Sequence, residues 1–361
     1  MKRYLSVLLI CLLVIIPLSG CNQTDTPQDI PDSIPAPDPV EPAQPDPDPA
    51  PEPDPGSEPG PAEPEPTGEN LSIVSTIFPQ YDWVRQILGY KAEYKDLTLV
   101  INNRIDLHNF QPSVSDIAKI STCDLFICVG GESDAWVDAV LAQALNPDMV
   151  VINLLKVLGD AALIDEEIDD GHHHHHHHDE DEYDEHVWLS MRNAVIFCTA
   201  ISKALAALDP ELSEFYAANL AEYIEKLTAL DAEYKTARAG AEVDTLLFAD
   251  RFPFRYLLND YDLDFYAAFS GCSAETEASF RTITFLARRI DELGLNNVMV
   301  TESADQSIAR TVISNSNTGD QQILVLDSMQ SANDDDWQRG VTFLSIMESN
   351  LRVLKEALEN R

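Results

Sequence analysis

Short runs of apolar residues alternate along this chain with segments whose apolar residues recur at helical spacing, which predicts buried strands separated by helices. The strand-like runs are Leu71–Phe78, Leu97–Ile101, Leu125–Gly130 and Met149–Leu154, and later Thr245–Ala249, Asp264–Phe269, Asn297–Thr301 and Ile323–Asp327. The helical segments are Tyr81–Leu88, Ser113–Ile120, Trp136–Leu145, Phe280–Leu293 and Asp336–Leu358. This alternation favours an α/β fold with two lobes, each a mostly parallel sheet flanked by helices.

One long amphipathic segment separates the two halves. Met191–Leu208 reads as a helix, Pro210 follows, and Glu211–Arg238 carries apolar residues every three or four positions. Proline is tolerated in the first turn of a helix, so Pro210 marks its start. At 1.5 Å per residue this helix would span about 42 Å. The pattern therefore predicts one long rigid linking helix that joins the lobes and resists hinge bending.

The first twenty residues have the pattern of an export signal. Lys2 and Arg3 precede the apolar run Tyr4–Leu18, which is too short for a stable membrane span. Leu18-Ser19-Gly20-Cys21 resembles a bacterial lipobox, in which Cys21 would become the lipidated first residue of the mature protein. The alternative is an ordinary signal peptide with a coincidental cysteine.

Residues 22–70 have the composition of a tether. They hold 16 of the 22 prolines, many beside Asp or Glu, and no Lys or Arg. Such a segment cannot bury enough apolar surface to fold, and proline keeps it extended. The predicted organisation is therefore signal peptide 1–20, lipidated cysteine and tether 21–70, N-terminal lobe 71–209, linking helix 210–240 and C-terminal lobe 241–361.

The net charge of −39 argues against nucleic-acid binding as the function of this chain. Much of that charge lies in the tether and in a histidine- and acid-rich loop at residues 165–185, where it favours solvation and attracts cations. Four cysteines remain after Cys11 and Cys21 are set aside. They are Cys123, Cys128, Cys198 and Cys272, and their pairing in an exported protein cannot be read from the sequence.

A run of seven histidines interrupts the chain between the two patterned halves. His172, His173, His174, His175, His176, His177 and His178 lead into an acidic tract. Imidazole rings cannot pack into a core unsatisfied, but they are good ligands for zinc, copper and nickel. The alternatives are an affinity tag or a solvated polar loop. A tag normally lies at a terminus, so the run predicts an accessory metal-attracting loop.

Two further histidines stand alone in predicted loops of the N-terminal half, His108 and His186. A lone histidine is more often structural than a ligand. Two of them, together with a histidine run and an export signal, instead favour a metal site. Imidazoles plus one or two carboxylates form a set of nitrogen and oxygen donors suited to zinc, whereas an all-oxygen set would suit magnesium or calcium.

Several motifs together resemble the metal-binding lipoproteins of bacterial zinc and manganese ABC importers, the ZnuA- and TroA-like family with a rigid linking helix. The resemblance covers nearly all of residues 71–361. Its motifs are Thr76-Ile77-Phe78-Pro79, Asp106-Leu107-His108-Asn109-Phe110, Glu185-His186-Val187-Trp188-Leu189, Glu275-Thr276-Glu277-Ala278-Ser279 and Leu326-Asp327-Ser328.

The resemblance implies a metal held between the lobes by His108, His186, a third residue at the end of the first C-lobe strand, and Asp327. The family usually has His or Glu at the third position, where this chain has Ala249 followed by Asp250. Asp250, a water or a histidine of the run could complete the ligand set. Asp327 could equally be an ordinary acid at a strand end, and Arg251 and Arg255 are expected to form interlobe ion pairs.

The resemblance further implies an extracytoplasmic, high-affinity zinc receptor, a monomer with no enzymatic activity. It would be held at the outer face of the membrane through lipid on Cys21 and deliver metal to an ABC permease and its ATPase. Manganese remains an alternative cargo. A zinc-dependent hydrolase using His108, His186 and a carboxylate is a second hypothesis. A surface protein acting in cell adhesion, or as a passive metal buffer, is a third.

Overall fold

The computed structural model describes residues 71–102, 105–165, 183–271, 277–330 and 332–359. Everything described below belongs to one compact unit within Glu63–Arg361. The predicted signal peptide, Cys21, the tether and His172–His178 lie outside the described residues, so the predictions made for them remain predictions.

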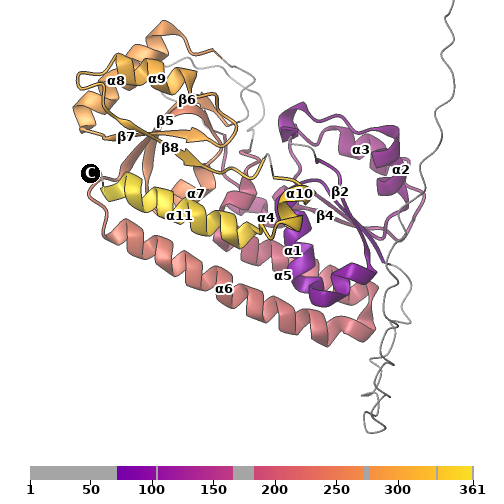
Figure 1. The fold of residues 1–361 in the computed structure, drawn as a ribbon. Coiled ribbons are helices and arrows are strands. Elements are labelled where there is room, and N and C mark those ends of the chain that lie inside the picture. The colour runs from indigo at the N-terminus through magenta and orange to yellow at the C-terminus, as the bar shows by residue number, and fades with distance from the viewer. Residues whose placement is uncertain (1–70, 103–104, 166–182, 272–276, 331, 360–361) are drawn as a thin grey trace, which may run out of the picture. The chain divides into compact units, whose positions relative to one another are not determined.

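The N-terminal lobe is built on four parallel strands in the order β2-β1-β3-β4 (Figure 1). The strands are β1 (Ser72–Ser75), β2 (Asp96–Leu99), β3 (Leu125–Cys128) and β4 (Val150–Asn153). The helices of this lobe are α1 (Phe78–Leu88), α2 (Val114–Thr122), α3 (Trp136–Leu141), α4 (Leu154–Leu158) and α5 (Met191–Leu208). Because all pairs are parallel, the carboxyl ends of the strands lie at one edge of the sheet.

The C-terminal lobe repeats this plan with four parallel strands in the order β6-β5-β7-β8. The strands are β5 (Thr245–Phe252), β6 (Asp264–Ser270), β7 (Asn297–Thr301) and β8 (Gln322–Leu326). The helices are α7 (Arg255–Asp260), α8 (Phe280–Leu293), α9 (Ser307–Ser314), α10 (Asp334–Gln338) and α11 (Phe343–Glu359). The predicted two-lobed α/β fold is confirmed.

Local sequence signals explain where several helices begin and end. The hydroxyl of Ser113 accepts a hydrogen bond from the backbone N–H of Asp116, whose carboxylate accepts from the N–H of Ser113, so the pair caps α2. Ser279 caps α8 in the same way through the N–H of Thr282. Gly294 ends α8 with φ of 62°, a left-handed conformation that glycine adopts without strain.

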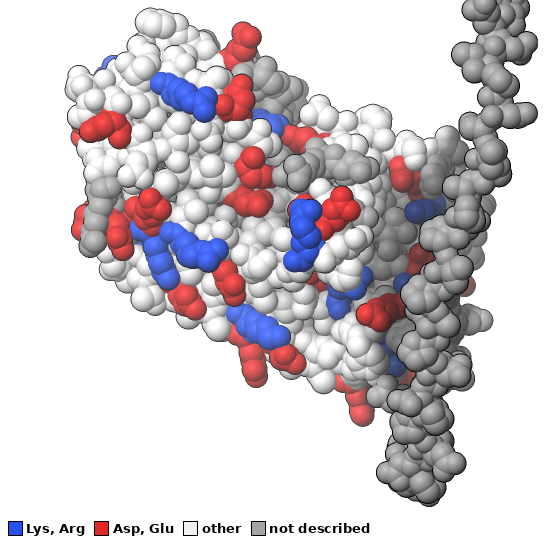
Figure 2. All heavy atoms as spheres, viewed as in Figure 1, with Lys and Arg blue, Asp and Glu red and all other residues white. Residues whose placement is uncertain are grey.

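The linking helix is α6, Ser213–Ala239, 27 residues long. It packs against α1 and α5 of the N-terminal lobe and against α11 of the C-terminal lobe (Figure 1). The side-chain amide of Asn219 donates to the carbonyl of Ile87 at 2.9 Å, and the hydroxyl of Tyr234 donates to the carbonyl of Met347 at 2.7 Å. Figure 2 shows acidic and basic side chains interspersed on the face that α6 and α11 present.

A buried carboxylate ties the two lobes at the start of α11. Asp82 of α1 accepts hydrogen bonds from the backbone N–H of Phe343 at 3.0 Å and from the amide of Gln86 at 3.1 Å. The Asp82 side chain is fully buried, and this burial raises its pKa to about 6. The core therefore continues from one lobe to the other through this contact, and Trp83 and Phe343 pack ring to ring beside it.

Two predicted helices differ from the observed ones. The segment Asp336–Leu358 is divided into α10 and α11, because Gly340 between them has φ of 83°. The predicted Trp136–Leu145 helix ends at Leu141.

Candidate metal centre

Two loops on the same side of the N-terminal sheet carry the lone histidines. His108 lies in a 3-10 turn, Leu107–Asn109, that follows β2. Its backbone N–H donates to the carboxylate of Asp106 at 3.0 Å, which fixes the turn. His186 immediately precedes a second 3-10 turn, Val187–Leu189, which leads into α5. Both imidazoles are thus attached to the rigid frame of one lobe.

The two imidazole rings converge although 78 positions separate them in the chain. Their Nε2 atoms lie 3.3 Å apart, and their ring centroids lie 5.2 Å apart at an interplanar angle of 61°. The side chain of His186 is fully buried, and that of His108 is 12% exposed. The predicted convergence of these two residues is confirmed.

A carboxylate determines the orientation of His186. The Nδ1 atom of His186 lies 3.0 Å from Oδ1 of Asp184, and the same oxygen accepts from the backbone N–H of His186 at 2.8 Å. A carboxylate beside Nδ1 keeps the proton on that nitrogen, so we assign a lone pair to Nε2.

The orientation of His108 is fixed by a hydroxyl and a second carboxylate. Its Nδ1 lies 2.6 Å from Oγ of Ser133, and the side chain and backbone N–H of Ser133 both hydrogen-bond to Glu185. The hydroxyl therefore donates to Glu185 and accepts from Nδ1 of His108, which leaves a lone pair on Nε2 of His108 as well. Burial raises the pKa of Glu185.

Electrostatics keep His108 neutral at pH 7. Burial, followed by the neighbouring His186 ring, lowers the pKa of His108 to about 4 against the opposing effect of Asp106. A neutral imidazole offers its lone pair to a metal without first losing a proton. The pair is thus prepared to act as two neutral nitrogen donors.

Two glycines allow other segments to approach these side chains closely. A Cβ on Gly131 would lie 2.1 Å from Oε1 of Glu185, and Gly131 has φ of 83°. A Cβ on Gly271, after β6, would lie 2.8 Å from Cε1 of His186. Any larger residue at Gly271 would therefore displace the imidazole.

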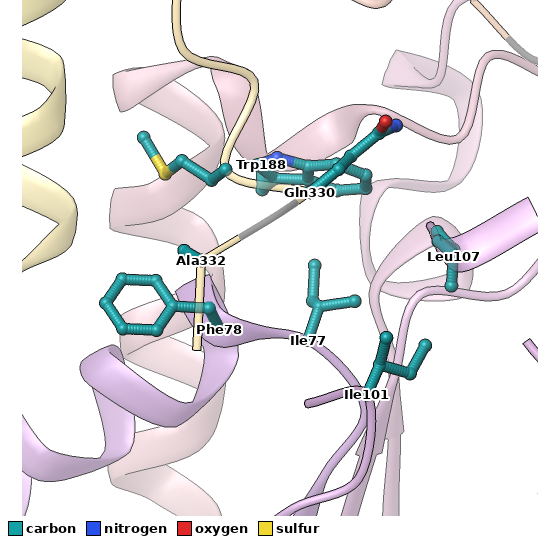
Figure 3. Close-up of a pocket in the computed structure, with 8 residues that line it drawn as sticks. Ile77, Phe78, Ile101, Leu107, Trp188, Gln330 and Ala332 are labelled. Carbon is teal, nitrogen blue, oxygen red and sulfur yellow. The ribbon is translucent and has the colours of Figure 1, made fainter. Parts of the chain in front are cut away.

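The C-terminal lobe contacts His186 through an amide. The Nε2 atom of Gln330, four residues after β8, lies 2.8 Å from Nε2 of His186. Residues of both lobes line the adjacent cavity of about 10 Å³, including Gln330, Trp188 and Leu107 (Figure 3). That volume has room for about one water molecule. Trp188 and Phe110, which follow the two histidines by two residues, are buried.

Two arginines bridge the lobes around the histidines. The guanidinium of Arg251 lies 2.6 Å from Oδ2 of Asp106, and that of Arg255 lies 3.7 Å from Oδ2 of Asp184 and 3.9 Å from Asp165. The predicted interlobe ion pairs are confirmed. Each one anchors a carboxylate that in turn hydrogen-bonds a histidine.

The two predicted acidic ligands have other partners. Asp250 accepts hydrogen bonds from the N–H and the hydroxyl of Thr301, at 2.9 and 2.6 Å, and so joins β5 to β7. Asp327 accepts from the N–H of Met329 at 2.8 Å, and burial together with Glu302 raises its pKa to about 7. In the described part of the chain no three His, Cys, Asp or Glu side chains are arranged to hold a metal. The ligand roles of Asp250 and Asp327 therefore remain predictions.

Three cysteines that the structure describes are free, buried thiols: Cys123, Cys128 and Cys198. Burial raises the pKa of each, that of Cys123 to about 12. These thiols are therefore poor metal ligands in the folded chain, because the ligand form of cysteine is the thiolate.

Sequence reasoning missed the contacts that surround the histidines. Asp184, two residues before His186, could have been found from its position, because an Asx side chain often hydrogen-bonds the backbone two residues on. Ser133 and Gln330 gave no signal, since neither residue type is characteristic of a metal site.

The family model described as zinc-uptake complex component A, periplasmic, matches residues 73–357. The zinc-binding lipoprotein AdcA of Streptococcus pneumoniae serotype 4 is 30% identical over 291 residues, which are 80% of this chain and 56% of that protein. The chain thus spans about half the length of this relative. The high-affinity zinc uptake system protein ZnuA of Bacillus subtilis is also 30% identical, over 81% of this chain and 88% of that protein.

The solved structures that resemble this chain include relatives of the same kind. The Zn(II)-bound ZnuA-like domain of Streptococcus pneumoniae AdcA superposes with a TM-score of 0.64 at 27% identity, over 81% of this chain and all of that one. The metal-dependent lipoprotein YcdH of Bacillus subtilis gives a TM-score of 0.65 at 27% identity, over 80% and 99% of the two chains.

Proposed function

Because the chain belongs to the ZnuA family of zinc-uptake components, we propose that it is an extracytoplasmic receptor that binds Zn²⁺ with high affinity and delivers it to an ABC importer. The observation that carries this proposal is the 3.3 Å separation of the two Nε2 atoms of His108 and His186. Zinc–nitrogen bonds of about 2.0–2.1 Å in tetrahedral geometry place two ligand nitrogens about 3.3–3.4 Å apart. The histidine pair therefore has the spacing of two zinc ligands.

The hydrogen bonds around the pair support the same conclusion. Asp184 hydrogen-bonds to Nδ1 of His186. Ser133 hydrogen-bonds to Nδ1 of His108 and is itself hydrogen-bonded to Glu185. Outer partners of this kind orient metal-binding imidazoles and raise their basicity. With the proton of each ring on Nδ1, the two Nε2 atoms at 3.3 Å cannot hydrogen-bond to each other. A divalent cation bound by both nitrogens would give them a shared partner.

The donor set favours zinc over the alternative cargo. Manganese prefers carboxylate, carbonyl and water oxygens, whereas imidazole suits zinc. Relatives of this chain are named for zinc. We therefore propose zinc as the cargo and keep manganese as the outcome that a competition titration would reveal.

The hydrolase hypothesis receives no support from the comparisons, since the family implies a binding role. A hydrolase would also need a general base, and two acids that could serve, Glu185 and Asp250, are both engaged in hydrogen bonds, to Ser133 and to Thr301. We propose a permease and an ATPase as partners, and a lipid on Cys21 as the membrane attachment of a monomer.

Zinc titration of the purified protein tests the proposed function. We expect one tight site per chain, retained when His172–His178 is deleted, because the described histidine pair is built without that run. Weaker sites should disappear with the deletion. Loss of the tight site in the deletion variant would refute the separation into a core site and an accessory loop.

Asp184→Asn should lower zinc affinity about 10- to 100-fold, the usual cost of removing an outer carboxylate from a metal-binding histidine. The amide still accepts a hydrogen bond, so the fold should persist while His186 becomes a weaker donor. Chelator competition measures the affinity. Asp165→Asn is the matched control, because Asp165 contacts the same Arg255. Equal affinities for the Asp184 variant and the wild type would contradict this role.

A further inference from the structure

The C-terminal lobe places a neutral amide, that of Gln330, against Nε2 of His186. The nitrogen of this amide lies 2.8 Å from Nε2 of His186. Because Asp184 holds the proton of His186 on Nδ1, Nε2 is the acceptor, and the amide N–H of Gln330 is the donor. The lone pair that a cation would use is therefore occupied by a hydrogen bond from the other lobe.

The loop that carries Gln330 is held at several points. The carboxylate of Glu302 accepts from the N–H of Ser328 at 2.8 Å and from its hydroxyl at 3.0 Å, and the indole N–H of Trp188 donates to the carbonyl of Ser328 at 2.9 Å. Met329 has φ of 63°, a left-handed conformation that is strained for a side chain of this kind. These contacts hold the backbone before Gln330, and from there its amide reaches His186.

Figure 3 shows Gln330 among residues of both lobes in the same small cavity, with Trp188 and Ala332. Nε2 of a neutral imidazole has a single lone pair in the ring plane, so it cannot accept the amide hydrogen bond and bind a cation at the same time. A cation that binds both histidines must therefore displace the hydrogen bond between Gln330 and His186.

We propose that Gln330 sets the affinity and the release rate of the receptor: its amide competes with the cation for Nε2 of His186 and returns to that nitrogen when the cation leaves. This inference rests on the proposed function, since it concerns the same cargo. The chemistry is a competition between a hydrogen bond and a metal–nitrogen bond at one lone pair. Gln330 therefore acts on the cation through His186. Its hydrogen bond lowers the affinity for the cation and speeds the release of the cation.

The variant Gln330→Ala tests the proposal, with zinc itself as the probe in chelator competition and stopped-flow release. Removing one competing hydrogen bond should tighten binding about two- to tenfold and slow release by a similar factor. Gln330→Glu, which has the same shape but cannot donate when ionised, should tighten binding further. Gln143→Ala is the control, because the side chain of this exposed glutamine hydrogen-bonds only the carbonyl of Ala139 among the described residues.

Each outcome decides the matter. Unchanged or weaker binding by Gln330→Ala overturns the proposal, and weaker binding combined with a tighter Gln330→Glu site would identify the amide oxygen as a ligand. Absence of a tight site in the wild type would instead refute the proposed function.

A second measurement does not depend on zinc binding. In the metal-free wild type, the ¹⁵N shift of His186 Nε2 should be that of a hydrogen-bonded acceptor, and it should move in Gln330→Ala. A shift that is identical in both proteins also overturns the proposal.

Discussion

Replacing His186 with alanine is expected to lower the affinity for zinc by more than about 100-fold, since loss of an outer partner alone costs 10- to 100-fold. Among the described residues, the only two imidazoles that meet are those of His108 and His186, and this change removes one of them. Isothermal titration or chelator competition measures the loss. His108→Ala should have an effect of the same order. Replacing one histidine of the run, His175→Ala, is the control and should leave the tight site unchanged.

His186 is also fully buried beside Trp188, so alanine leaves a small cavity. His186→Gln keeps most of the volume and one hydrogen-bonding group, and thermal unfolding of both variants separates loss of fold from loss of ligand. A folded His186 variant that retains wild-type zinc affinity would show that the converging histidines are not the cargo site.

Asp82→Asn is expected to become more stable relative to the wild type as the pH rises from 4 to 6. The folded-state pKa of Asp82 is raised from 3.8 to about 6, mainly by burial. A group with a raised carboxyl pKa binds its proton more tightly in the folded chain, so the wild type loses stability as the pH rises through this window. Each unit of the shift corresponds to about 1.4 kcal/mol. The asparagine variant carries no such proton.

The measurement is the difference in free energy of unfolding between variant and wild type, from denaturant titrations at several pH values. This difference should change by up to about 3 kcal/mol and level off above pH 6. Asparagine can still accept from the backbone N–H of Phe343, so the contact with α11 is kept. Asp138→Asn, at an exposed position of α3, is the matched control for the substitution itself. A flat difference for Asp82→Asn would contradict the raised pKa.

The sequence predicted the two sheets and the linking helix because their signals are local and strong. All eight strand-like runs correspond to strands, and Phe280–Leu293 is observed with the predicted bounds. The boundaries that differ depend on local side-chain hydrogen bonds and backbone angles, which hydrophobic periodicity does not reveal. The first strand ends at Ser75, because the side chain of Gln80 accepts from the N–H of Thr76 and Ile77 and turns the chain into α1.

Sequence reasoning identified the two histidines of the candidate site but not its third ligand. His108 and His186 could be singled out because isolated histidines in loops are rare in this chain. The third metal ligand could not be assigned from the sequence, because β5 contains a register shift between Phe248 and Arg251. Such an irregularity re-aims side chains, and alternation along a strand does not reveal it. Asp250 consequently bonds to Thr301, while Arg251 reaches Asp106.

The three buried thiols have a consequence for how cargo binding is measured. Sulfur is a softer and stronger zinc donor than imidazole, and folding withdraws Cys123, Cys128 and Cys198 from contact with the ion. Heating exposes them again, so a melted chain would itself capture zinc. A metal that binds both states raises the melting temperature by less than its affinity for the folded state implies. The zinc-induced rise in melting temperature should therefore understate the affinity for zinc. Replacing these cysteines with alanine or serine should make that rise larger.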